Sequence, residues 1–112
     1  MDATTTLFQE LYPHLALYCG LHGLPHPEVA YGQPITKGAV ACCHPTRWQI
    51  IIDKKFGAVS EKTAGHELAH LIVRQEDRGD SITHGKKFIA KEMEIERFCL
   101  MERRKEIRAK RA

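Results

Sequence analysis

A histidine–glutamate motif inside an apolar segment is the feature that most constrains this chain. Between residues 61 and 75, apolar side chains cover most of the circumference of an expected helix, which indicates that the helix is buried. His66 and His70 are four residues apart, so they project from one face about 6 Å apart, with Glu67 beside them. Buried polar side chains need partners. The motif therefore predicts that the two imidazoles bind one metal ion.

A third protein ligand is expected from the residues that follow. His84 comes after residues 77–81, whose turn-forming composition allows the chain to reverse and return His84 to the helix. Histidine nitrogens with an adjacent carboxylate suit a hydrolytic zinc site, because the ion activates water and the carboxylate accepts its proton. A glutamate from the next helix, Glu92 or Glu94, is an alternative third ligand.

Gly65 precedes the motif, and nothing in the local sequence explains a glycine at this position of a helix. Glycine in a helix interior costs about 1 kcal/mol relative to alanine. Its place before His66 predicts that another group approaches the helix closely there.

Length and composition indicate one globular domain spanning residues 1–112. Apolar residues make up 43% of the 112 residues and charged residues 28%, which is typical of a soluble protein. No apolar run approaches the ~20 residues that span a bilayer, so no membrane partner is expected. The first residues show no secretory signal, which predicts a cytoplasmic location that is compatible with nucleoid or nuclear association.

The cysteines are expected to be free thiols. Cys19, Cys42, Cys43 and Cys99 form no CxxC pair, and the chain shows no secretory signal. Cys42 and Cys43 are neighbours on an expected strand and point to opposite faces, so they would not readily share one ion.

The positive charge is concentrated at the C-terminal end. Residues 97–112 carry seven basic and two acidic side chains, a balance of +5, whereas the whole chain has a net charge of +3. One interpretation is a solvated helix end. The other is non-specific contact with DNA phosphates, made through Arg103, Arg104, Lys105, Arg108, Lys110 and Arg111.

The order of elements predicts an α+β fold. A helix over residues 4–22 is either kinked at Pro13 or restarts there. Strands are expected at 29–31, 39–43 and 47–52, forming a small three-stranded antiparallel sheet. Ser60 is the expected N-cap of the motif helix, and a long helix begins at Lys86 with its last ten or so residues outside the core.

Two motifs together resemble a known family. His66-Glu67-Leu68-Ala69-His70, followed after the loop by His84-Gly85-Lys86-Lys87-Phe88, is similar to the SprT-like metalloprotease domain, the family of the Spartan proteases. The resemblance covers the layout of nearly the whole chain, and its recognisable motifs lie within residues 61–92. The chain departs from the family in lacking a C-terminal cysteine zinc ribbon and recruitment motifs, and in the small residues Ala64 and Gly65.

The resemblance implies a minimal zincin-like domain that hydrolyses peptide bonds. It implies His66, His70 and His84 as Zn²⁺ ligands and Glu67 as general base, with protein substrates that include DNA-associated or DNA-crosslinked proteins. An extended substrate could pair with an exposed sheet edge, for which the 47–52 strand is the candidate.

The alternative function is a nucleic-acid-binding accessory protein without protease activity. In that case the zinc site is structural and its fourth position is closed by Cys42, Cys43 or His44.

Overall fold

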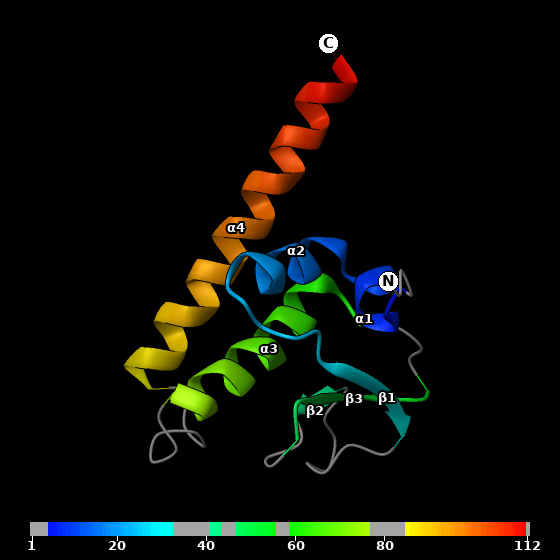
Figure 1. The fold of residues 1–112 in the computed structure, drawn as a ribbon, viewed down its shortest axis with the longest axis vertical. Coiled ribbons are helices and arrows are strands. Elements are labelled where there is room, and N and C mark those ends of the chain that lie inside the picture. Colours follow the sequence, from blue (N-terminus) through cyan, green and yellow to red (C-terminus); the bar gives the residue numbers. More distant parts are fainter. Residues whose placement is uncertain (1–4, 33–40, 44–46, 56–58, 77–84, 112) are drawn as a thin grey trace.

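The chain forms four helices and three strands within the residues that the structure describes (Figure 1). The structure is a computed structural model, and it describes residues 5–32, 41–43, 47–55, 59–76 and 85–111. The elements in chain order are α1 Leu7–Leu11, α2 Pro13–Leu21, β1 Glu28–Gly32, β2 Ala41–Cys43, β3 Gln49–Asp53, α3 Glu61–Glu76 and α4 Lys86–Arg111. The fold class is therefore α+β, as the sequence predicts.

The N-terminal helical segment is divided in two at the predicted proline. Tyr12 leaves helical geometry with φ −135° and ψ 70°, and Pro13 begins α2 because it needs no hydrogen bond for a backbone N–H. The Thr6 side chain caps α1 by accepting from the backbone N–H of Gln9 at 3.0 Å. The Tyr12 hydroxyl donates to the Val59 carbonyl at 2.8 Å, which ties this junction to the segment before α3.

The sheet is mixed, so the prediction of an antiparallel sheet is wrong for one of its two pairings. The strand order is β1-β3-β2, with β2 antiparallel to β3 and β1 parallel to it. The antiparallel pairing is correct for β2 and β3, which are close in sequence, but β1 adds to the other side of β3 in parallel. The strand predicted at 47–52 is consequently central and not an edge, and Ile50 and Ile52 are fully buried.

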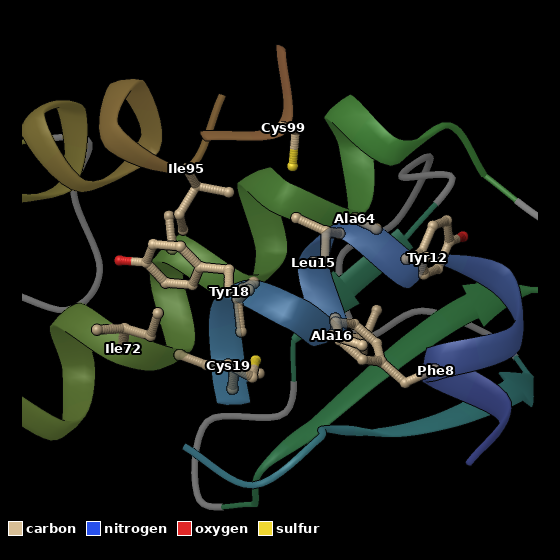
Figure 2. Close-up of a cluster of buried hydrophobic side chains, with 14 of the residues drawn as sticks. Phe8, Tyr12, Leu15, Ala16, Tyr18, Cys19, Ala64, Ile72, Ile95 and Cys99 are labelled. Atoms are coloured by element: carbon tan, nitrogen blue, oxygen red, sulfur yellow. The ribbon is translucent and has the colours of Figure 1, made fainter. Parts of the chain in front are cut away.

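Helix α3 packs between the sheet and the other helices. It contacts β2 and β3 on one side and α4 on another, while α2 also packs against α4. Ala64, Leu68 and Ala69 have no exposed surface. Figure 2 shows side chains of α2, α3 and α4 converging in this core, among them Leu15, Ala64 and Ile95. The Ser60 hydroxyl accepts from the Thr63 backbone N–H at 3.2 Å, which confirms the predicted N-cap.

Helix α4 covers the core with its first half and extends past it with its second. Phe88, Ile95 and Cys99 are buried, whereas every residue from 103 to 111 is exposed, as predicted for the last residues. Figure 1 shows this end projecting away from the remaining elements. No described helix combines the length and the apolar character that a membrane crossing requires.

Two ion pairs hold the second half of α4 to the body, and a third joins their partners on α2 and α3. The His14 ring contacts Glu61 at 3.0 Å and Glu106 at 2.7 Å, and Arg103 also pairs with Glu61. The hydrogen bond with Glu106 is the main cause that raises the pKa of His14. The chain beyond Met101 is therefore exposed but not independent of the domain.

The four cysteines are free thiols, as predicted. Cys19, Cys42 and Cys99 are buried, and Cys43 is partly exposed. Burial raises the pKa of Cys19 to about 11 and that of Cys99 to about 12, so both stay protonated at neutral pH.

Two other helices contact α3 at Gly65, as predicted, but they come no closer than an ordinary contact with a methyl group, so the approach does not require glycine. A Cβ atom at this position would be 3.4 Å from Ile95 Cγ2 and 3.6 Å from Leu15 Cδ2. These are ordinary contact distances for one methyl group, but they leave no room for a longer side chain.

We expect opposite effects from small and large substitutions at Gly65. Gly65→Ala should raise the free energy of unfolding by up to about 1 kcal/mol through helix propensity. Gly65→Leu should lower it by about 1–3 kcal/mol, because the added atoms meet Ile95 and Leu15. Gly20 in α2 is the matched control, since nothing lies within 4 Å of its would-be Cβ. Urea denaturation of the alanine and leucine variants at both positions measures this. Equal stability of Gly65→Leu and Gly20→Leu would show that Ile95 and Leu15 do not restrict the space at Gly65.

Candidate metal centre

The two histidines of the motif lie next to each other, one turn apart on α3, with their rings in an edge-to-face contact. Their ring centres are 4.9 Å apart and the ring planes cross at 84°. Two imidazoles bound to one tetrahedral zinc ion at about 2.0–2.1 Å have ring centres roughly 5 Å apart. The spacing of His66 and His70 therefore fits a shared ion. Both side chains are partly exposed, which leaves the pair accessible.

Phe88, in the first turn of α4, packs against both imidazoles. Its ring stacks on His70 with centres 4.1 Å apart and meets His66 edge-on at 5.0 Å. Phe88 is 2% exposed, so its ring is packed tightly and restricts the space beside His66 and His70. This contact brings the described part of the second motif, residues 85–88, onto the helix that carries the first.

Glu67 lies on the sheet side of α3 and is buried. Only 8% of it is exposed, and this burial raises the pKa of its carboxyl to about 7. Three influences oppose the rise in pKa: the charge of His66, and the backbone N–H and thiol of Cys43 in β2. The carboxyl group is thus held near His66 and strand β2.

Glu92 and Glu94, the alternative ligands from α4, lie in different places. Glu92 Oε2 is 2.5 Å from His66 Nδ1, so this carboxylate is beside the predicted site. Glu94 instead accepts a hydrogen bond from the Tyr18 hydroxyl of α2 and pairs with Lys91 at 3.4 Å. The structure therefore brings Glu92, and not Glu94, to the histidine pair.

His84, the predicted third ligand, lies outside the described residues, as does His44. Among the residues that are described, no three His, Cys, Asp or Glu side chains are arranged to hold a metal ion. Two of the three predicted ligands are therefore placed, and their geometry suits a shared ion.

The histidines expected not to be ligands have other partners. His14 joins the ion pairs with Glu61 and Glu106, and His26 Nδ1 is 2.8 Å from the Thr6 hydroxyl. His22 stacks on Tyr18 with ring centres 4.1 Å apart. All three come from the N-terminal part of the chain and not from the α3 pair.

Sequence reasoning missed the contacts that α4 makes with the histidines. It treated Phe88 as a motif residue without a role and Glu92 only as an alternative ligand. A signal was available, because residues 88 and 92 are four apart on one expected helix, as are 66 and 70 on another. Two such pairs can face each other where two helices pack.

Comparison with models of protein families, with curated proteins and with solved structures finds no match. The resemblance to SprT-like proteases therefore depends on the two motifs and their separation.

The three predicted ligands should each be needed for zinc binding. We expect His66→Ala, His70→Ala and His84→Ala to lose bound zinc, because a site with three protein ligands has none to spare. Zinc content and a competition titration with a chromophoric chelator measure this. His22→Ala, which removes an exposed histidine, is the control and should bind zinc as the parent chain does. Full zinc affinity in His84→Ala would transfer the third-ligand role to Glu92.

Proposed function

We propose that this chain is a zinc-dependent metallopeptidase that hydrolyses peptide bonds in protein substrates, with a minimal zincin-like architecture. The observation that carries the proposal is the arrangement on α3. Two imidazoles lie one turn apart with ring centres 4.9 Å apart, a spacing that one zinc ion can bridge, and the buried carboxyl group of Glu67 lies beside His66. His66, His70 and His84 are the proposed ligands.

In this proposal a bound zinc ion supplies Lewis-acid activation of water and of the scissile carbonyl. Glu67 accepts the proton of the attacking water and delivers it to the leaving amine. Its burial keeps the carboxyl group in one orientation and limits competing contacts with bulk water. Phe88 limits rotation of both imidazoles by contacting each ring.

The strand that would bind an extended substrate is β2, in place of the central strand at 47–52. Both sides of β3 are already paired, whereas β2 pairs on one side only among the described strands. β2 also contacts α3, and its Cys43 faces the Glu67 carboxyl. A peptide added beside β2 by backbone hydrogen bonding would therefore pass next to the proposed base.

One observation supports the alternative, a structural zinc site in a nucleic-acid-binding accessory protein. The Cys43 thiol lies beside Glu67, so among the described residues it is a candidate for a closed fourth position. Burial raises its pKa to about 12, which disfavours the thiolate that binds metal. Cobalt substitution separates the two functions, because a thiolate ligand gives an intense near-ultraviolet charge-transfer band and an open site with nitrogen ligands does not.

Glu67→Gln should abolish hydrolysis and keep the metal. The amide has the same shape but cannot accept the proton, and losing a general base typically costs about 10²–10⁴-fold in rate. Cleavage of an unfolded protein such as casein, followed beside zinc content, measures this.

The control is Glu96→Gln, the same chemical change at an exposed position of α4. It should leave cleavage unchanged. Parent-like turnover in Glu67→Gln would remove this residue from the mechanism.

We further propose that the exposed end of α4 contacts DNA phosphates without reading sequence. Arg103 and Lys105 are paired with Glu61 and Glu102, so the cations that best suit this role are Arg104, Arg108, Lys110 and Arg111. Residues 101–112 contain no aromatic side chain to stack on bases, so the affinity would be electrostatic.

The double variant Arg108→Gln/Arg111→Gln should bind duplex DNA more weakly and with a shallower salt dependence. Removing one cation that neutralises a phosphate should reduce the slope of log K against log salt by roughly 0.9. Fluorescence anisotropy over a range of salt concentrations measures this. Lys54→Gln/Lys55→Gln removes the same charge from the exposed turn after β3 and should leave the slope unchanged. Equal reductions of the slope in both double variants would show that the helix end has no special role.

A further inference from the structure

Helices α3 and α4 present matching pairs of side chains to each other. His66 and His70 are one turn apart on α3, and Phe88 and Glu92 are one turn apart on α4. Phe88 contacts both rings, and Glu92 Oε2 is 2.5 Å from His66 Nδ1. Helix α4 thus holds the His66 ring in two ways, by an aromatic contact with Phe88 and by a hydrogen bond with Glu92.

The hydrogen bond determines which ring nitrogen of His66 carries the proton. A carboxylate can only accept, so a neutral His66 that bonds Glu92 donates Nδ1–H. Its lone pair is then on Nε2. Nε2 lies away from the hydrogen bond with Glu92, so its lone pair is left to bind a metal ion.

Glu92 and Glu96 of α4 lie at the same cavity, whereas Glu94 does not. A cavity of about 150 Å³ lies between α3 and α4, and both His66 and Glu92 line it. Glu96 lines the same cavity one turn further on, and Glu94 is on the side of α4 that faces Tyr18. Glu92 and His66 are each about one third exposed, at 30% and 33% of their side chains.

We propose that Glu92 is a positioning residue, which fixes His66 in the Nδ1-protonated tautomer and so directs Nε2 toward the metal. Carboxylates that hold metal-binding histidines in this way act on metal affinity through the orientation and basicity of the ring. The role rests on the proposed zinc function, but the tautomer itself is a property of the metal-free chain.

Two variants of Glu92 separate its role as hydrogen-bond acceptor from the effect of its negative charge, and a third variant is a control. Glu92→Ala removes both, whereas Glu92→Gln keeps an oxygen that can accept from Nδ1–H but removes the charge. Glu96→Ala is the matched control, because it removes a carboxylate from the same cavity. Far-ultraviolet circular dichroism and urea denaturation check that each variant is folded.

The first measurement is the tautomer of His66 in metal-free protein, read from two-bond nitrogen–proton NMR correlations. The parent chain, Glu92→Gln and Glu96→Ala should carry the proton on Nδ1, and Glu92→Ala should show a mixture of tautomers. A proton on Nε2 in the parent chain, or an unchanged tautomer in Glu92→Ala, would overturn the proposal.

The second measurement is zinc affinity by chelator competition. Glu92→Ala should bind zinc about 10–100-fold more weakly, as is typical when such a partner is removed. Glu92→Gln should lose less, and Glu96→Ala should bind as the parent chain does. Unchanged affinity in Glu92→Ala would overturn the proposed role.

X-ray absorption of the zinc protein distinguishes positioning from direct ligation. If an oxygen neighbour of zinc disappears in Glu92→Ala, Glu92 is the third ligand and the positioning role is wrong. If the parent chain binds no zinc, the proposed protease function and the positioning role both fail. If zinc binds while the tautomer result is negative, the positioning role alone fails.

Discussion

The burial of α3 between the sheet and the other helices is the constraint on which the rest of the structure depends. Ala64, Leu68 and Ala69 are fully buried, so neither side of this helix can be left without a covering element. The sheet covers the side that carries Glu67, and α4 covers the other together with the Leu15 side chain of α2, which reaches Gly65. A carboxyl group is held in an apolar region because the helix that carries it must be buried there, and the cost appears as the raised pKa of Glu67.

The covering helices also position the histidines. Because α4 packs along α3, residues four apart on one helix meet residues four apart on the other, and Phe88 and Glu92 reach the two imidazoles. At the N-terminal end of α3, Glu61 joins His14 and Arg103, which ties the N-termini of α2 and α3 to the exposed half of α4. The middle and the N-terminal end of α3 are thus both connected to α4.

The elements could be predicted from local patterns, but the sheet order could not be derived by the same reasoning. The helix restart at Pro13, the Ser60 cap and the antiparallel pair β2–β3 each depend on residues close in sequence. The parallel pairing of β1 with β3 joins segments about twenty residues apart, and no local turn specifies it. The three consecutive isoleucines of β3 were an available signal, since continuous apolar runs are typical of central strands.

The candidate site divides in the same way between local and distant residues. The histidine pair and Glu67 were predictable because helical periodicity fixes their spacing, whereas the role of Glu92 depends on how α4 is aligned with α3.

The two carboxyl groups beside His66 have different surroundings. Glu67 is 8% exposed and faces β2, and the Glu92 side chain is 30% exposed in the cavity between α3 and α4. A carboxyl group with a raised pKa suits proton transfer, and a solvated one that accepts from Nδ1–H suits orientation of the ring. The difference in burial therefore supports the two proposals, proton transfer by Glu67 and ring orientation by Glu92.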